Sequence, residues 1–270
     1  MRWLSALPVL LLGLLFVAGL AEIASMALET PGGAGLANFA GILAREDYRA
    51  TILRTFWFAA IVTAVSIPIG VCCGLFLART SLRRGPLLAL VLTPWLVSVV
   101  VRSYGWTVVL GNRGVVNWAL QEIGLTGGPI QFLYQPLGTI IGLVHVFAPL
   151  LVLSVMSAAL HHDRALEEAA SCLGSRPFQT FRLVTLPVIA PGIVTGASIV
   201  FLLSCGAVVT PLLLGGLRQT MIASQIYQDV FHTFDLPKAS AMSMLLLATT
   251  LVIALAAALL RAGLGRGRTA

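Results

Sequence analysis

Six long apolar segments, each close to the length of a bilayer-spanning helix, dominate this sequence of 270 residues. About 20 apolar residues carry a helix across the hydrocarbon core, where no water can pair an exposed backbone amide. With 58% hydrophobic and 10% charged residues, the chain also falls outside the composition of soluble domains. The sequence predicts an all-α, polytopic membrane protein whose six transmembrane helices form one domain, residues 1–270. The predicted spans are about 4–27, 55–78, 86–110, 137–160, 188–214 and 239–260.

The first apolar segment has two interpretations. Arg2 precedes an apolar run from Leu4 to Ala21, an arrangement that also occurs in secretory signal peptides. The apolar core of a cleaved signal usually has about 7–15 residues, whereas this run is longer. The length favours a retained first span over a cleaved signal.

A polar segment, residues 161–187, separates the fourth apolar run from the fifth and is called the knuckle below. Asp163 can cap a short helix there, and Glu167 and Glu168 would lie in its first turns, where the helix dipole favours negative charge. Ala169 and Ala170 are small enough for another surface to approach the backbone closely. This half of the knuckle therefore predicts a short helix with an accessible face.

The second half of the knuckle predicts a turn and another helix. Gly174 suits the left-handed conformation that ends many helices. Ser175 can cap a second helix, with Pro177 tolerated in its first turn, and Leu186-Pro187 marks the next predicted break. We expect a helix-turn-helix structure that lies outside the bilayer.

The distribution of charge predicts how the chain is oriented. With both termini in the cytoplasm, the cytoplasmic segments carry ten basic and three acidic residues, and the outer segments carry seven of each. The whole formal excess of +7 then lies in the cytoplasm, as the preference of positive residues for that side requires. The basic charge is therefore topological and predicts no nucleic-acid partner. The cytoplasmic basic residues are Arg2, Arg79, Arg83, Arg84, Arg164, Arg176, Arg182, Arg261, Arg266 and Arg268.

The third apolar segment is interrupted by polar residues. Pro94 lies inside it, and Arg102 stands where a central arginine would cost about 2.5–3.5 kcal/mol on insertion. We therefore expect Arg102 to lie near the outer interface or to face the protein interior. Tyr104 and Trp106 suit either an interfacial aromatic belt or the mouth of a solute path.

Three segments are predicted to lie outside the spans on the outer side. Residues 29–51 are expected to be an exposed loop, and residues 111–135 to contain a short amphipathic helix that ends at Gly124. Residues 215–238 are expected to form an outer loop. In that loop Asp229 is either part of a mouth that attracts cations or a solvated loop residue.

A stripe of small polar residues lies in the fifth apolar segment. Thr195, Ser198 and Cys205 recur close to one helical face. Such residues often pack helices together in membranes, and a role in the solute path is the alternative hypothesis. In the fourth segment, His145 is expected to be a core histidine with a partner.

Several chemistries are absent from the sequence. The single lysine, Lys238, follows no glycine-rich loop, so the chain has no Walker A phosphate site. The sequence also has no HExxH motif, no Gly-x-Ser-x-Gly motif and no pair of intramembrane aspartates. Its four cysteines show neither metal-ligand nor disulfide spacing. These absences argue against ATP binding and against proteolysis by this chain. A stand-alone secondary transporter and, more remotely, an intramembrane enzyme stay open as alternative functions.

The knuckle also carries a longer pattern: Glu-Ala-Ala from Glu168, three residues, Gly174, nine residues, and Val-x-Leu-Pro ending at Pro187. This pattern resembles the cytoplasmic EAA loop of permease subunits from bacterial ABC importers, with Val184 where the family usually has isoleucine. The resemblance implies that the knuckle docks in a groove of a separate ATPase subunit. That partner would bind ATP and Mg²⁺, and this chain would hold no cofactor, metal or catalytic residue. The implied coupling residues are Glu167, Glu168, Ala169, Ala170, Gly174, Ser175, Arg176 and Phe178.

Further segments are similar to the first permease of spermidine/putrescine-type importers. They are residues 101–106, residues 110–114 with Asn117, residues 142–145 and residues 211–216. This resemblance implies the six-span fold of type I importer permeases in a bacterial inner membrane. The implied partners are a second homologous permease in a heterodimer, two ATPases and an external solute-binding protein. Iron, thiamine and opine systems use permeases of the same group, so the solute stays open. The candidate solute-path residues are Tyr104, Trp106, Ser198, Cys205 and Asp229.

Overall fold

The computed structural model describes residues 2–30, 33–80, 84–161, 163, 165–216 and 219–266. Arg83, Arg164, Arg218 and Arg268, which contribute to the charge argument, lie outside these residues. The elements are α1 (Arg2–Leu28), β1 (Glu29–Thr30), β2 (Gly33–Ala34), α2 (Ala37–Ala44), α3 (Glu46–Arg79), α4 (Arg84–Leu96), α5 (Val99–Leu110), α6 (Val115–Glu122), α7 (Pro136–Leu160), α8 (Ala165–Cys172), α9 (Pro177–Thr180), η1 (Phe181–Thr185), α10 (Leu186–Cys205), η2 (Pro211–Gly215), α11 (Ile222–Phe231) and α12 (Leu236–Arg266).

The described residues contain five helices that are long and apolar enough to cross a membrane, and a sixth span if one bent pair of helices is counted as a single span. The bent pair joins Arg84–Leu96 to Val99–Glu122 at an angle of 91°. The prediction of an all-α membrane protein is confirmed, and that of six spans is met with the bent pair as one span. The straight spans are Leu10–Leu28, Glu46–Arg79, Pro136–Leu160, Pro177–Cys205 and Leu236–Leu259.

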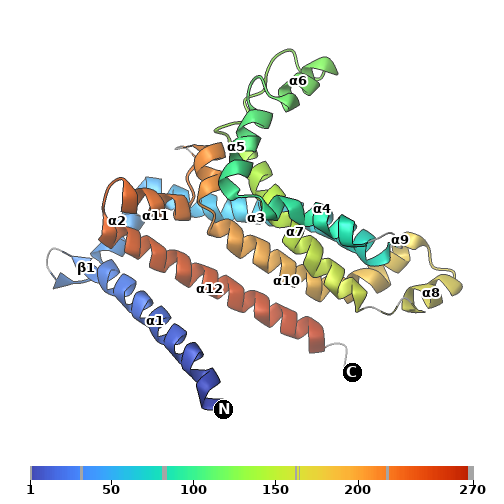
Figure 1. Ribbon diagram of the computed structural model, residues 1–270, viewed down its shortest axis with the longest axis horizontal. Coiled ribbons are helices and arrows are strands. Elements are labelled where there is room, and N and C mark those ends of the chain that lie inside the picture. Colours follow the sequence, from blue (N-terminus) through green and yellow to red (C-terminus); the bar gives the residue numbers. More distant parts are fainter. Residues whose placement is uncertain are drawn as a thin grey trace.

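Three helices, α3, α7 and α10, form the core of the bundle (Figure 1). Glycines let these helices approach closely, as small residues do between membrane helices. A Cβ atom on Gly74 of α3 would lie 2.9 Å from the carbonyl oxygen of Val152 in α7. One on Gly192 of α10 would lie 2.5 Å from the Cβ of Ala158. The core is therefore packed backbone against backbone and has little space for larger residues.

Two outer helices, α1 and α12, lie side by side along one flank of this core (Figure 1). From Leu10 onward the apolar side chains of α1 are mostly exposed, so that hydrocarbon lipid is the medium that suits them. The β1–β2 hairpin follows α1, and the Nδ2 group of Asn38 donates to the carbonyl oxygens of Ala27 and Glu29 at its base. These contacts hold the C-terminal end of α1 against α2.

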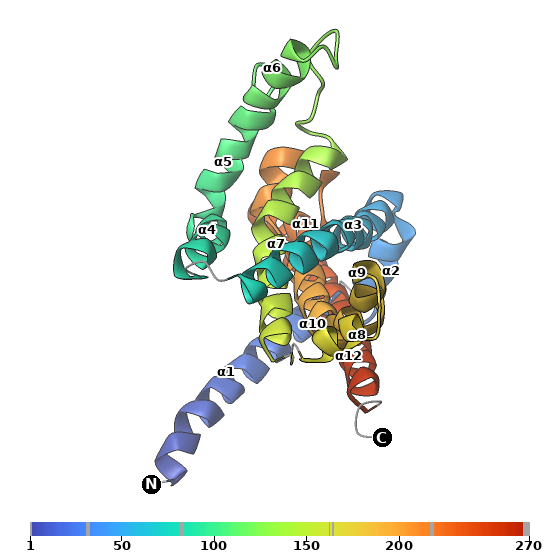
Figure 2. The same cartoon turned by 90° about the vertical axis from the view of Figure 1, so that its right-hand side faces the viewer.

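The third predicted span, residues 86–110, is not one straight helix. It breaks after Leu96, and α5 and α6 extend away from the bundle (Figure 2). Pro94 has no N–H to continue the helical ladder, and Arg102 supplies replacement donors. Its guanidinium donates to the carbonyl oxygens of Pro94 and Val97, which the break leaves without helical partners. Arg102 thus faces the backbone of its own span.

The predicted break at Leu186-Pro187 is wrong. The chain is one continuous helix from Pro177 to Cys205, with a π-helical turn, η1, directly before the proline. The N–H of Leu186 donates to the carbonyl of Phe181, five residues earlier, which widens the helix where Pro187 has no donor. The fifth span also ends at Cys205 rather than at residue 214, and η2 follows as a separate turn.

Two predicted outer loops are largely helical. Residues 29–51 contain α2 and the start of α3, which begins at Glu46 instead of residue 55. Glu46 and Asp47 lie in its first turn, where negative charge is favoured, and Tyr48 and Thr51 are buried behind them. The second region, residues 215–238, contains α11. The mixed charges at residues 45–49 concealed the start of α3, and the polar residues of α11 concealed that helix.

Candidate coupling site and solute groove

The knuckle begins with the predicted short helix, α8. The N–H of Ala165 donates to Oδ1 of Asp163 at 3.0 Å, so the predicted cap is present. At the other end Gly174 has φ +83°, and the N–H of Ser175 reaches back to the carbonyl of Ala170 at 3.1 Å. With the bond from Gly174 N–H to the Ser171 carbonyl, these contacts form the paired C-terminal turn that a left-handed glycine allows. The prediction for Gly174 is confirmed.

The second half of the knuckle is capped differently from the prediction. Arg176, rather than Ser175, is the residue before α9, and its N–H donates to Oε1 of Gln179 at 3.0 Å. Ser175 instead pairs its hydroxyl with that of Thr180 at 2.5 Å. Gln179 thus acts as the reciprocal half of a capping box, with Arg176 at the position that serine or threonine usually holds. Ser175 therefore links the turn to α9 through the Thr180 hydroxyl and does not cap the helix.

One face of the knuckle is exposed. Glu168 and Ala169 are exposed on α8, and Phe178 of α9 is 72% exposed. Leu173, which sequence reasoning missed, is 89% exposed beside the turn. Its position directly before a capping glycine was the available signal, because such a turn holds that side chain outward. In Figure 1, α8 and α9 lie at the end of the bundle opposite α2 and α11. Large apolar side chains on such an end suit a protein surface that covers them.

Glu167 faces the bundle instead of the exposed surface. Its Oε1 atom lies 2.5 Å from the guanidinium of Arg79 and accepts a hydrogen bond from the hydroxyl of Thr185 at 2.6 Å. The Glu167 side chain is 19% exposed. The two neighbouring glutamates of the predicted coupling set therefore have different surroundings: Glu168 is open to a partner and Glu167 is bound within the chain.

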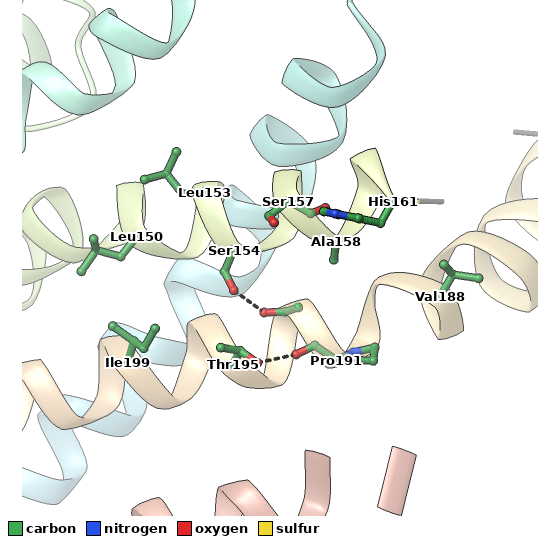
Figure 3. Close-up of a pocket in the computed structure, with 11 residues that line it drawn as sticks. Leu150, Leu153, Ser154, Ser157, Ala158, His161, Val188, Pro191, Thr195 and Ile199 are labelled. Carbon is green, nitrogen blue, oxygen red and sulfur yellow. Dashed lines mark hydrogen bonds between the residues drawn. The ribbon is translucent and has the colours of Figure 1, made fainter. Parts of the chain in front are cut away.

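A groove of about 640 Å³ runs between α7 and α10 on the knuckle side of the bundle (Figure 3). The hydroxyl of Ser154 donates across its floor to the carbonyl of Gly192 at 2.9 Å, and that of Thr195 donates to Pro191 at 2.8 Å. Ser157 and His161 line the same wall. Hydroxyl and imidazole groups amid apolar walls can orient a small polar solute.

Only part of the predicted polar stripe reaches this groove. Thr195 lines it, whereas Ser198 donates to the carbonyl of Val194 at 2.6 Å within its own helix. Cys205 is completely buried. The structure therefore separates three residues that helical spacing grouped together, and the groove is built by α7 residues that the sequence did not single out.

Tyr104 and Trp106 lie on α5, away from the groove. Trp106 donates its indole N–H to Nδ1 of His145 at 3.1 Å, and the two rings meet edge to face at 5.3 Å. This contact fastens α5 to α7 and gives His145 the partner that was expected of a core histidine. Tyr104 is exposed on the outer arm.

Asp229 is neither a solvated loop residue nor an open part of the outer mouth. It lies on α11 and is 1% exposed. Its carboxylate accepts hydrogen bonds from Tyr48 at 3.3 Å and Gln225 at 3.0 Å, and lies 3.9 Å from Nζ of Lys238. These groups join α3, α11 and α12. The expectation of an exposed acid is corrected, because a buried carboxylate with these partners stabilises the end of the bundle where α3 begins.

Comparisons with known proteins identify the family. Residues 37–266 match the family described as "Binding-protein-dependent transport system inner membrane component". The chain is 32% identical over 197 residues to the spermidine/putrescine transport system permease protein PotB of Haemophilus influenzae, covering 73% of this chain and 69% of PotB.

Solved structures agree on the fold. A chain of a bacterial ABC transporter involved in import of the acidic polysaccharide alginate aligns with a TM-score of 0.77, over 96% of this chain and 94% of that one. The same transporter in complex with an alginate pentasaccharide-bound periplasmic protein gives 0.76, over 94% and 91%. At 21% identity these likenesses concern the fold alone, which is that of a type I importer permease. The chain therefore belongs to the family of inner membrane components of binding-protein-dependent transport systems.

Proposed function

We propose that this chain is one half of the membrane pathway of an ATP-driven importer of small solutes. A second homologous permease would complete the pathway, two ATPase subunits would drive it, and an external binding protein would deliver the solute. The chain itself breaks no bond, because its sequence has no phosphate-binding loop and ATP would be hydrolysed on its partners.

The knuckle is the observation that carries this proposal. Its turn is fixed by Gly174, and the neighbouring Glu168, Ala169, Leu173 and Phe178 are all exposed. A rigid, exposed, partly apolar surface at one end of a membrane bundle suits a groove on a soluble partner. Glu168 would add a charged contact to a basic group there. Neither a stand-alone transporter nor an intramembrane enzyme would need such a surface.

Polyamines are the solute class we propose. The support is the similarity to a spermidine/putrescine permease, together with the hydroxyl and imidazole groups of the α7–α10 groove, such as Ser154, Ser157 and His161. Hydroxyl oxygens accept hydrogen bonds from ammonium groups. No carboxylate is among the residues that line this groove, so the second subunit and the binding protein would contribute the discrimination between charged solutes.

Reconstitution tests the proposed function. A tagged chain co-expressed with the neighbouring genes is expected to copurify an ATPase. In liposomes that complex should hydrolyse ATP faster when the binding protein is loaded with spermidine, and it should accumulate labelled spermidine. Stimulation by another solute alone would replace the polyamine assignment. A wild-type chain that purifies without an ATPase and transports without ATP would contradict the importer assignment.

We further propose that both termini and the knuckle lie in the cytoplasm. The excess of basic residues on that side supports this orientation. In Figure 1 the free ends of α1 and α12 lie toward the same side as α8 and α9.

Thiol labelling tests this orientation. Cys172 on α8 is exposed and serves as a native reporter after Cys72→Ala and Cys73→Ala, while Cys205 is buried. In cells that express the chain without partners, a membrane-impermeant maleimide is expected to react with Cys172 only after permeabilisation. Leu125→Cys, at a position 68% exposed beyond α6, is the matched control and should react in intact cells. The reverse pattern would invert the orientation.

A further inference from the structure

One carboxylate oxygen joins three elements at the base of the knuckle. Oε1 of Glu167, in the first turns of α8, lies 2.5 Å from the Arg79 guanidinium and 2.6 Å from the Thr185 hydroxyl. Arg79 is the last residue of α3, and Thr185 is the last residue of the π-helical turn η1. Arg79 and Thr185 lie 88 and 18 residues from Glu167 in the chain, so this contact brings together segments that are distant in the sequence.

The next residue, Glu168, has no such role. Successive side chains point about 100° apart around a helix, so one glutamate faces the bundle while the other is exposed. The Glu168 side chain is exposed and makes no hydrogen bond or ion pair to another side chain among the described residues. Glu167 and Glu168, which the sequence analysis grouped as coupling residues, therefore face in different directions.

The mechanical connections of the knuckle show why this contact matters. On one side α9 continues through η1 into α10 without a break, so α9 and the fifth span move as one body. The other half, α8, connects to α9 through the turn at Gly174 and also packs on α9 and η1. The Glu167–Arg79 pair adds a link from α8 to α3, and α3 packs tightly on α7 at Gly74. Displacement of α8 would then reach the second span directly.

We propose that Glu167 is the positioning residue that ties the knuckle to α3 and to the base of α10, and that it is not a contact for the ATPase. The inference rests on the proposed function, because the motion to be transmitted comes from the partner. The Glu167–Arg79 pair adds little to the folding stability of the chain, since partly exposed ion pairs contribute only about 0–1 kcal/mol. Arg79 is 43% exposed at the rim of a hollow of about 560 Å³ that Glu167 and Cys172 also line.

A matched pair of substitutions separates attachment from transmission. In the reconstituted complex, Glu167→Gln is expected to keep the ATPase bound within about twofold of wild type. Solute-stimulated ATP hydrolysis and uptake should fall at least about fivefold, the lower end of usual couplings between sites. Glu168→Gln should instead reduce the amount of bound ATPase. Wild-type uptake in Glu167→Gln, or loss of ATPase equal to that in Glu168→Gln, would overturn the proposal.

Exchange of the charges tests the link to α3. Arg79→Glu and Glu167→Arg are each expected to lower solute-stimulated hydrolysis and uptake, as Glu167→Gln does, and the two together to recover most of both. A double variant no better than the single ones would show that the effect does not pass through Arg79, and would refute the tether to α3. Thr185→Val, which removes the hydroxyl and preserves the shape, should give a smaller loss than Glu167→Gln.

A measurement on the isolated subunit makes this inference independent of the ATPase. With Cys72→Ala and Cys73→Ala, a spin label on Cys172 reports the mobility of α8. Glu167→Gln should sharpen the spectrum in liposomes, and Glu168→Gln should leave it as in wild type. Equal spectra for all three proteins would refute the tether even if the importer assignment holds. If the Glu167→Gln spectrum sharpens but the wild-type chain copurifies no ATPase, the tether is retained and the importer assignment is refuted.

Discussion

Gly174→Val is expected to release the ATPase from the complex while the membrane spans stay folded. At φ +83° a side chain is strained by about 1–2 kcal/mol, and more for a β-branched residue. A Cβ at this position would meet nothing within 4 Å, so the penalty comes from the backbone alone. The strain is relieved by opening the turn, which loses the hydrogen bonds from Ser175 and Gly174, each worth about 1 kcal/mol. Leu173 would then leave its exposed position.

The amount of ATPase that copurifies measures this effect, and a loss of about 1.4 kcal/mol corresponds to tenfold weaker binding. Gly174→Asn is the matched control, because asparagine tolerates the left-handed conformation, and it should retain most of the ATPase. The thermal melting of the spans in detergent should be the same for both variants. Full attachment of the ATPase to Gly174→Val would show that the turn is not required for docking.

A large effect on stability is expected for Gly74. A Cβ at this position would lie 2.9 Å from the Val152 carbonyl oxygen and 3.0 Å from the Met156 backbone nitrogen. These are backbone atoms of α7 and cannot rotate away, so α3 and α7 must separate. Gly74→Ala should therefore lower the free energy of unfolding by about 1–3 kcal/mol, the usual cost of overpacking. Gly74→Leu should prevent accumulation of folded protein.

The same substitution at Gly105 provides the control. Gly105 lies in α5 and would place its Cβ in open space, so Gly105→Ala should be neutral or stabilising by up to about 1 kcal/mol through helix propensity. Size-exclusion chromatography and thermal melting in detergent measure both variants. A wild-type melting temperature for Gly74→Ala would mean that the α3–α7 contact is looser in solution than in the structure.

The features that the sequence predicted well depend on local rules. The cap at Asp163 and the left-handed Gly174 follow from the preferences of single residues at helix ends, and both are present. The long spans follow from segment length and hydrophobicity, which any neighbouring structure leaves unchanged. The helix in the outer loop ends near Gly124, which has φ +71°. In each case the information lies within a few residues.

The errors arose where distant residues decide the structure. Asp229 was expected to be exposed because it is charged, but Tyr48, 181 residues away, supplies a buried hydrogen bond. Pro187 is the one local exception: it was expected to break the helix, but a widened turn made by its own neighbours carries the helix past it. The groove residues of α7 were not identified, because serines in an apolar span become meaningful only when α10 lies opposite. No pattern within one segment contains these pairings.

Because no break separates α9 from α10, a movement of α9 is also a movement of the fifth span. The helix has 29 residues and therefore a length of about 40 Å, with the docking surface at one end and the interior of the bundle along the rest. If the docked end is tilted by about 5°, the far end near Cys205 moves by about 3–4 Å, since a stiff rod of that length amplifies small angles. A flexible loop at Leu186-Pro187 would let α9 tilt without moving α10. The widened turn instead carries the helix past the proline without a loop, so in the proposed importer a rotation of α9 would be passed on to α10.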